Sequence, residues 1–349
     1  MSASEAPRLV QYATPSAFLR AALPFDNWHL NLDLGSTLQW LVEEGDAPGT
    51  CLWFAVWTGE KLDLTATRMG STLTVCSPVH SSSLSPSWLG PRIQLLAAEV
   101  HTLITAGTQP ALSSVRAAVP LVDAFAAQYR ALSGLFPEEI LMEYWASHCP
   151  RSRVSLDPPH LPEGHEIRVV EPGDARALAA VTELVHTFRV HLNGPDSKES
   201  RQAATQAELG VKGREYMVYV ITDAEGKEAY AGYVRDGRFT SKHAAIRNVF
   251  TLPQWRRRGI AEALTRAAVV RLLTEPHKMA KVLAPLLPAE EEAKIEDVTI
   301  NTANAKTNLV AQGVYRRVGF GFPDGDWDEG DGRSWEDCIE LGYPGNTGH

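Results

Sequence analysis

The sequence predicts an α+β (mixed α/β) fold in two domains, each with a central, mostly antiparallel, twisted sheet flanked by helices. Three runs of strand-forming residues follow one another between residues 51 and 78, and helical patterns come after them. Residues 147–165 then carry four prolines and no sustained period, as a linker does. A second set of strands and helices follows. We therefore expect a first domain at 1–147, a proline-rich linker at 148–165 and a second domain at 166–349.

The first domain combines short strands with amphipathic helices. Its strands are expected at 8–12, 52–57, 62–67 and 72–76, and its helices at 16–22, 92–106 and 122–132. Gly59 and Gly70 lie in the turns between the last three strands, which predicts a meander. Residues 138–147 fit either a third helix or a closing strand. The order is thus strand, helix, meander and then helices.

The second domain begins with the same coarse order. Its strands are expected at 166–170, 215–222, 228–236, 244–252, 297–301, from 319–320 onward, and at 335–341; its helices are expected at 175–191, 259–273 and from 303 or 304 to 318. Asp174 is a suitable N-cap for the first of these helices. Residues 276–296 form an insertion, which looks helical in its part PAEEEAKIED. The first domain therefore repeats the order of the second.

Composition narrows the functional classes. The chain has 349 residues, 44% of them hydrophobic, and a formal net charge of -9 at pH 7, which excludes a general nucleic-acid binder and is compatible with a cationic substrate. No run reaches the ~18 apolar residues of a membrane helix, and the N-terminus has no secretory pattern. The four scattered cysteines, Cys51, Cys76, Cys149 and Cys338, fit reduced structural thiols better than a metal site. We expect a cytoplasmic protein without a membrane or nucleic-acid partner.

The chain is organised around a strand, an arginine-rich turn and a helix between residues 246 and 273. Pro253 closes the strand, and apolar residues recur at three- and four-residue spacing from Ile260 onward. The helix should begin near Gly259, where unpaired backbone N–H groups and the helix dipole favour an anion. Arg256, Arg257 and Arg258 add positive charge there. The segment predicts a site for a pyrophosphate or a similar anion.

Two motifs in the second half carry a family resemblance. The spacing Arg256-x-x-Gly259-x-Ala261 resembles the acyl-CoA signature of the GNAT superfamily of N-acetyltransferases, although alone it also fits an ordinary arginine-rich turn. It lacks the ending of a Walker loop and the three glycines of a Rossmann fingerprint. The second motif, Asn308-x-x-Ala311-x-x-x-Tyr315-x-x-x-Gly319-Phe320, resembles the second GNAT motif and places Asn308, Ala311 and Tyr315 on one helix face. Together they identify the second half as GNAT-like over about residues 165–343.

The resemblance implies acetyl-CoA as co-substrate and assigns residues to it. The strand that ends at Thr251 would be splayed from the parallel strand 299–301, so that the pantetheine arm pairs with it as an extra strand. The residues implied in cofactor binding are Val249, Phe250, Thr251, Arg256, Arg257, Arg258, Gly259, Ile260, Ala261 and Asn308. Tyr315 occupies the position that protonates the departing thiolate, and a phenol with a pKa of ~10 is protonated at neutral pH.

The resemblance also implies direct transfer, in which an amine attacks the thioester and a backbone N–H near Val249 or Phe250 polarises the carbonyl. The base that accepts the amine's proton is not evident, because residues 244–251 contain no carboxylate. Asn248 and Asn301 are candidates for positioning a water, and so is His243; Glu183 is a more distant alternative. A water chain to solvent would also suffice.

An acidic run near the C-terminus permits two interpretations. Asp324, Asp326 and Asp328 alternate as at the start of a calcium loop, but Glu329 and Trp335 stand where that loop needs Gly and Glu. We therefore expect a solvated hairpin between the last strands, which could also border the acceptor pocket, and no metal.

The first half lacks the arginine turn, and in its order of elements it resembles the degenerate N-terminal halves of tandem GNAT proteins. Its expected role is to wall the acceptor pocket. We expect an acyl-CoA-dependent N-acyltransferase, most simply an acetyltransferase acting on a small-molecule amine. A protein or peptide amine as acceptor, and a non-catalytic acyl-CoA sensor, are the alternatives.

Overall fold

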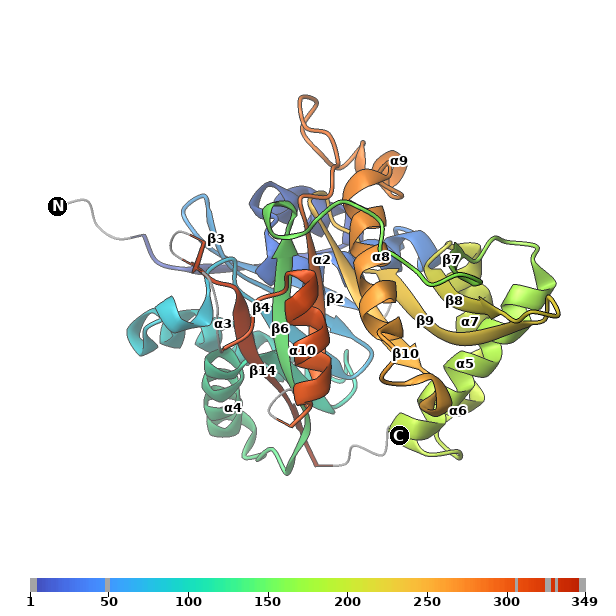
Figure 1. Cartoon of the computed structure of the whole chain (residues 1–349). Coiled ribbons are helices and arrows are strands. Elements are labelled where there is room, and N and C mark those ends of the chain that lie inside the picture. Colours follow the sequence, from blue (N-terminus) through green and yellow to red (C-terminus); the bar gives the residue numbers. More distant parts are fainter. Residues whose placement is uncertain (1–4, 48–50, 305–306, 324–327, 330–331, 345–349) are drawn as a thin grey trace.

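Figure 1 shows the chain as a computed structural model, which describes residues 5–47, 51–304, 307–323, 328–329 and 332–344. The first half contains β1 (Arg8–Tyr12), α1 (Pro15–Ala22), α2 (Asn31–Glu44), β2 (Leu52–Thr58), β3 (Lys61–Met69), β4 (Thr72–Cys76), α3 (Pro86–Thr105), β5 (Ser114–Ala118), α4 (Val119–Ser133) and β6 (Glu139–Pro150). Within the described ranges, no helix combines the length and apolar character required to cross a membrane.

The second half repeats this order with a few additions. It contains β7 (His165–Val169), α5 (Ala175–Asn193), α6 (Lys198–Arg201), α7 (Ala203–Lys212), β8 (Tyr216–Thr222), β9 (Glu228–Gly237), β10 (His243–Thr251), α8 (Ile260–Thr274), α9 (Ala280–Leu283), β11 (Asp297–Ala303), α10 (Leu309–Val318), β12 (Asp328–Glu329), β13 (Gly332–Arg333) and β14 (Trp335–Gly342). Apart from the short additions α6, α9, β12 and β13, the two halves match element for element. The predicted repeat is confirmed.

The two halves share one sheet because each gives its last strand to the other. The described strands form a twelve-stranded sheet in the order β1-β2-β3-β4-β5-β14-β6-β11-β10-β9-β8-β7. The last strand of the chain, β14, pairs with β5 of the first half. The last strand of the first half, β6, pairs with β11 of the second half. This exchange joins the halves by backbone hydrogen bonds and places β6 and β14 at the centre of the molecule.

The parallel strands β10 and β11 separate along their length. They pair only from His243 opposite Asp297 to Ile246 opposite Ile300. Beyond this point β10 stays with β9, with a register shift between Ile246 and Asn248, while β11 stays with β6 as far as Ala303. A bulge of this kind bends its strand, and here it lies where the pair opens. The fold is thus the predicted mixed α/β fold with a splayed parallel pair.

Different helices cover the two faces of the sheet beside this split. Helices α8 and α10 contact each other and lie in front of the sheet in Figure 1. Helix α2 lies on the other face, where Asn31 accepts a hydrogen bond from Thr299 Oγ1 at 2.9 Å and Gln39 accepts one from Arg247 at 3.0 Å. Because α2 also contacts β3 and β4, it bridges the halves. Leu34 and Leu38 of α2 share a core cluster with Ile246.

Several elements differ from the sequence prediction. The segment PAEEEAKIED is not helical; the helix of the insertion is α9, before Pro285 and Pro288, and the three successive glutamates of the segment repel one another. Residues 319–320 do not begin a strand, because Gly319 ends α10 at φ 128° and Phe320 packs into the core.

Other differences concern elements that no expectation covered. These are α2, β5, α6 and α7. Residues 138–147, left open between helix and strand, lie mostly in β6, which continues to Pro150 within the expected linker. Of the acidic run, residues 324–327 and 330–331 lie outside the described residues, and β12 pairs antiparallel with β13. All four cysteines are buried and free.

Candidate active site

The loop between β10 and α8 has an unusual backbone. Arg257 adopts φ 62° and Gly259 φ 75°, and Arg258 between them is not left-handed. Such alternation turns successive backbone N–H groups toward one side and forms an anion-binding concavity. Gly259 is the N-cap residue of α8 and has no side-chain cap, so the first N–H groups of the helix remain available. A left-handed non-glycine residue such as Arg257 is strained, and strain of this kind concentrates at functional sites.

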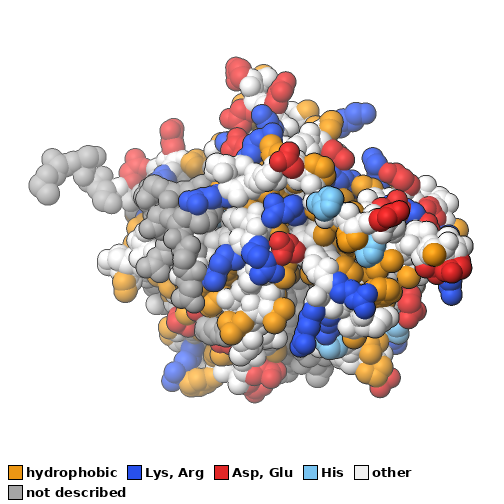
Figure 2. Space-filling view, viewed as in Figure 1, with side chains coloured by type: hydrophobic (Ala, Val, Ile, Leu, Met, Phe, Trp, Pro, Cys, Tyr) orange, Lys and Arg blue, Asp and Glu red, His pale blue; other side chains and the backbone are white. Residues whose placement is uncertain are grey.

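The three arginines of this loop are exposed, and two of them are held by neighbours. Arg256 Nε donates to the carbonyl of Thr251 at 3.1 Å, which ties the loop to the end of β10. The Arg258 guanidinium lies 4.8 Å from the centre of the Trp255 ring. Figure 2 shows Lys and Arg side chains spread over this face of the molecule, although the chain as a whole is acidic. The loop is therefore a local positive site.

A groove runs between this loop and the segment that connects the halves. Its walls are Ser155, Asp157, Pro158, Pro159 and His160 on one side, and Gly259, Glu262, Ala263 and Arg266 of α8 on the other. The expected linker thus lies against the first turns of α8, and Gly259 and Ala263 open into the groove.

Helix α10 begins later than the second motif predicts. Asn308 is its N-cap, and the Asn308 side chain accepts from Ala311 N at 3.3 Å. Tyr315 lies in the following turns, half-buried, with its ring 6.2 Å from that of Phe320. Burial raises the pKa of Tyr315 to about 12. The phenol is therefore protonated at neutral pH, as an acid must be.

The end of β10 presents its backbone rather than its side chains. The Phe250 side chain is buried, and its ring centre lies 5.5 Å from that of Phe188 of α5; Thr251 is buried as well. Asn248 and Val249 are half-buried beside the split. Glu183 lies exposed on α5 and does not line the pocket described next.

A pocket lies on the α2 face of the sheet at the junction of the halves, and we call it the central pocket. Its cavity volume is about 40 Å³, so only a small ligand can enter it. Both halves contribute to it. Among its lining residues are Trp28, His29, Cys76, Tyr144, Arg238, Thr299, Asn301 and Glu336. Asn301 lies on β11 just past the last paired residue, Ile300, so the pocket reaches the split between β10 and β11.

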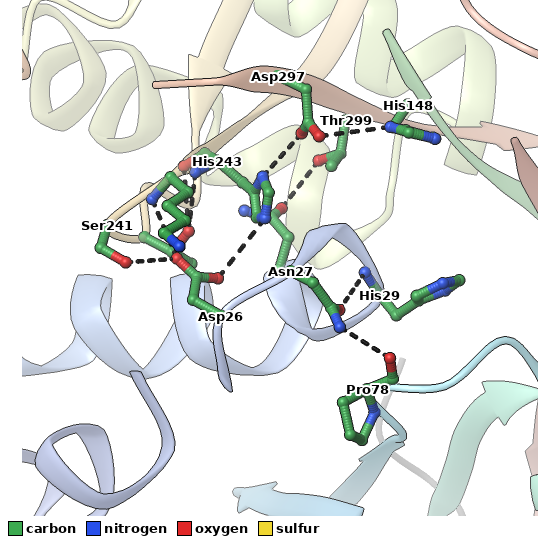
Figure 3. Close-up of polar contacts among 12 residues, drawn as sticks. Asp26, Asn27, His29, Pro78, His148, Ser241, His243, Asp297 and Thr299 are labelled. Carbon is green, nitrogen blue, oxygen red and sulfur yellow. Dashed lines mark hydrogen bonds and ion pairs between the residues drawn. The ribbon is translucent and has the colours of Figure 1, made fainter. Parts of the chain in front are cut away.

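A histidine and a carboxylate form a pair in the wall of the central pocket. His29 Nδ1 lies 3.2 Å from Glu336 Oε2, and the other carboxylate oxygen of Glu336 accepts from Ser81 N at 2.7 Å. Burial raises the pKa of Glu336, but His29, His80 and the Ser81 N–H together outweigh this effect and hold the pKa below its ordinary value. His29 N donates to Asn27 Oδ1, and Asn27 Nδ2 donates to Pro78 O (Figure 3). The carboxylate can therefore orient the imidazole.

A second cluster of buried histidines and carboxylates connects the two halves. Figure 3 shows His243 between Asp26 and Asp297, with His148 on the other side of Asp297. His243 Nδ1 is 2.7 Å from Asp297, and His243 Nε2 is 3.9 Å from Asp26. Burial lowers the pKa of His243, but the two carboxylates outweigh it and raise the value to about 9. His243 is thus a cation at neutral pH and unsuited to accept a proton.

The structure brings Asn301 to the central pocket and leaves Tyr315, Asn308 and the arginine loop on the α8 and α10 side of the sheet. The sequence motifs gave no indication of His29, Glu336, Tyr144 or Arg238. These residues lie in four separate segments, and only the strand exchange and the position of α2 bring them together.

Comparison with known proteins agrees with the geometry. A family model described as an acetyltransferase (GNAT) domain matches residues 214–321, which include β8–β11, α8 and α10. A comparison with curated protein sequences gave no match.

Among solved structures, a Drosophila protein is 14% identical with a TM-score of 0.52, covering 97% of this chain and 98% of that one, and it shares the fold. A GCN5-related N-acetyltransferase from Sphaerobacter thermophilus is 17% identical with a TM-score of 0.49, covering 95% of each chain. A tandem GNAT protein from the clavulanic acid biosynthesis pathway is 15% identical with a TM-score of 0.46, covering 96% of this chain and 97% of that one. On the family match, the C-terminal half of this chain contains an acetyltransferase domain of the GNAT family.

Proposed function

We propose that this enzyme transfers an acetyl group from acetyl-CoA to the primary amine of a small molecule, and that the amine binds in the central pocket. The observation that carries the proposal is the separation of β10 from β11 beyond Ile246 and Ile300. On one side of the sheet, this gap lies near the arginine loop and α10. On the other side it meets the central pocket at Asn301. Two reactants approaching from opposite faces would meet in the gap.

The residues present fit acetyl-CoA as co-substrate. Backbone N–H groups from Arg257 to Ala261, with Arg256 and Arg258 beside them, would hold the pyrophosphate. Among the described residues, the edge of β10 from Asn248 to Thr251 has no strand partner on the β11 side, and it would pair with the pantetheine amides. The groove between α8 and residues 155–160 has room for the nucleotide end. Asn308, as the N-cap of α10, would border the arm and position this helix.

The proton movements follow from the two sides of the gap. The amine nitrogen attacks the thioester carbonyl carbon, and the carbon–sulfur bond breaks as the carbon–nitrogen bond forms. His29 Nε2 takes the proton that the amine loses, and Glu336 stabilises the resulting imidazolium through Nδ1. Tyr315, kept protonated by its raised pKa, gives a proton to the departing sulfur. Backbone N–H groups at the β10 bulge would stabilise the oxyanion, and Asn248 and Asn301 would orient the amine or a water.

The enclosure of the pocket favours a small acceptor over a protein. Helix α2, residues 28–32 and strands β6 and β14 surround the central pocket, whereas a peptide needs an open groove. The first half thus supplies pocket walls and the base, without its own arginine turn.

Thiol release from acetyl-CoA, measured with amino acids, polyamines, arylamines, aminoglycosides and peptides, tests this function. We expect turnover with one class of small amine. Acetyl-CoA binding without turnover in the presence of any amine would indicate a sensor, and turnover restricted to peptides would indicate a protein acetyltransferase. A chain that does not bind acetyl-CoA would refute the assignment of residues 256–261.

A further inference from the structure

We propose that the acceptor amine also carries a carboxylate and that Arg238 binds this carboxylate in the central pocket. The acceptor would then be a short amino acid, with its amine toward the gap between β10 and β11. This inference rests on the proposed function, because it names the substrate class of the same site.

The first observation is a guanidinium without a counter-ion. Arg238 lines the central pocket, and its Nε is buried without a hydrogen-bond partner in the described part of the chain. Within the same described ranges it forms no ion pair. Arg238 as a whole is half-buried, and a partly desolvated charge without a counter-ion is costly. An anion that enters the pocket would therefore supply the partner that the described residues do not provide.

The surroundings of Arg238 are positive. Burial, and then the charges of Arg247 and Arg116, lower the pKa of Arg238 to about 9, so it remains charged at neutral pH. Arg247 of β10 is half-buried, and its hydrogen-bond partner in the described part of the chain is the neutral amide of Gln39. The acidic residue that lines the pocket, Glu336, is already engaged by His29 and Ser81. The local field therefore favours an anionic ligand, in contrast to the net charge of the chain.

A second polar group lies in the same pocket. Tyr144 is only 4% exposed, and among the described residues its hydroxyl has the thiol of Cys338, a weak hydrogen-bonding group, as its neighbour. Burial is the main cause that raises its pKa well above the ordinary value, so the hydroxyl keeps its proton. Tyr144 and Arg238 both line the central pocket. A carboxylate can accept from a guanidinium and a phenol together.

The backbone of Arg238 is held in a strained conformation. Its φ is 48°, a left-handed value that suits asparagine or glycine better than arginine. Asn31 Nδ2 of α2 donates to Arg238 O at 2.7 Å, and Gly35 of α2 lies so close that a Cβ there would be 2.5 Å from the same oxygen. The first half thus fixes the backbone that carries the guanidinium. An arginine in this place costs stability, so it needs a reason beyond the fold.

The anion is not a phosphate of the cofactor. The arginine loop and α10 lie on the α8 side of the sheet, whereas Arg238, Asn31 and Thr299 lie on the α2 side. A planar carboxylate matches the fork of a guanidinium, and the modest pocket volume favours an amine and a carboxylate separated by few atoms.

The direct test is calorimetry without acetyl-CoA, using the common L-amino acids, β-alanine and γ-aminobutyrate, each compared with its carboxamide. We expect at least one acid to bind, with its amide about 100-fold weaker. The key variant is R238N, because asparagine tolerates the left-handed backbone. It should unfold at the same or a higher temperature while binding of the acid falls about 100-fold. R238K should restore part of the affinity, and R130Q, at an exposed position of α4, should change nothing.

The outcomes separate this inference from the proposed function. In thiol-release assays, R238N should raise KM for the acid with little change in kcat and should leave the amide unaffected. If no acid binds, if acid and amide bind equally, or if R238N binds the acid like wild type, the inference is overturned. If the acid binds in an Arg238-dependent manner but acetyl-CoA is neither bound nor consumed, the carboxylate site stands and the acetyltransferase assignment of this pocket fails.

Discussion

His29 and Glu336 come from opposite ends of the chain, and their Nδ1 and Oε2 atoms lie 3.2 Å apart in the wall of the central pocket. His29 precedes α2 of the first half, and Glu336 lies on β14, the strand exchanged between the halves. The pair therefore depends on the joined architecture and does not belong to either half alone. A first half without an arginine turn can still contribute to chemistry in this way.

Replacing His29 by glutamine should remove the base while keeping a polar side chain of similar size. We expect kcat to fall about 100-fold, because general base catalysis contributes roughly this factor, with little change in KM for acetyl-CoA. The pH profile supplies a sharper readout. The acidic limb of kcat/KM that reflects proton acceptance should disappear in the variant. H101Q, at a half-buried position of α3 outside the central pocket, is the control. A variant that keeps the wild-type pH profile would exclude His29.

Removing the hydroxyl of Tyr315 tests the acid on the other side of the gap. Tyr315→Phe keeps the ring and its contact with Phe320, so stability should change by less than about 1 kcal/mol. Turnover should fall by about 100-fold while the Kd for acetyl-CoA stays the same. Calorimetry and thiol release on the same preparation check both. Normal turnover would show that the departing thiolate takes its proton from solvent.

Alanine substitutions at two glycines can distinguish an effect on cofactor binding from an effect of backbone strain. Gly259 has φ 75° and Gly107 has φ 71°, and a Cβ at either position would meet no atom within 4 Å. Alanine at either position should therefore lower the free energy of unfolding by about 1 kcal/mol, because both residues have a left-handed backbone conformation. Only Gly259→Ala should weaken acetyl-CoA binding, by about tenfold, because it distorts the N–H groups at the start of α8. Equal affinities in the two variants would contradict the assignment of this loop.

The sequence predicted most strands and the strand, turn and helix to which it assigned cofactor binding, because those features are local; the binding role of their residues stays a prediction. The run from Ile246 to Leu273 contains its strand, turn and helix, and hydrophobic spacing alone identifies them. Asn308 and Tyr315 likewise follow from one motif, although the helix begins only after Asn308. Helix α2 was missed, because its periodicity is weak and its polar residues Asn31 and Asp33 are buried against other strands.

The acceptor side was not predictable for a different reason. His29, Arg238 and Glu336 are unremarkable in their own segments, and their proximity results from the exchange of β6 and β14. Nor does net charge reveal the local field, since the chain is acidic while Arg238 of the central pocket feels the positive charges of Arg247 and Arg116. Of the proposed base residues, His243 lies just before the expected strand 244–252 and is the first residue of β10, but the carboxylates beside it come from distant positions and fix its charge.

The charge of His243 makes the joining of the halves depend on pH. Its folded pKa, about 9, lies above the unfolded value of about 6.5, so the folded state binds the proton more tightly. The resulting stability is fully present below pH ~6.5 and is lost as the pH rises toward 9, and a shift of this size corresponds to about 3 kcal/mol. The opposite shift, in Asp297, whose pKa its histidine neighbours lower despite burial, affects stability only at acidic pH.

Urea unfolding at several pH values between 6.5 and 9.5 measures this contribution. The free energy of unfolding of the wild type should decrease across this interval, and that of His243→Gln should decrease by about 3 kcal/mol less. The variant leaves Asp26 and Asp297 without their cation and is therefore less stable at pH 6.5. For this reason the comparison uses the slope of the unfolding free energy against pH and not its absolute value. His160→Gln, in the segment between the halves, should keep the wild-type slope. Equal slopes for His243→Gln and wild type would mean that His243 is neutral in the folded protein, and that Asp26 and Asp297 are not held together by its charge.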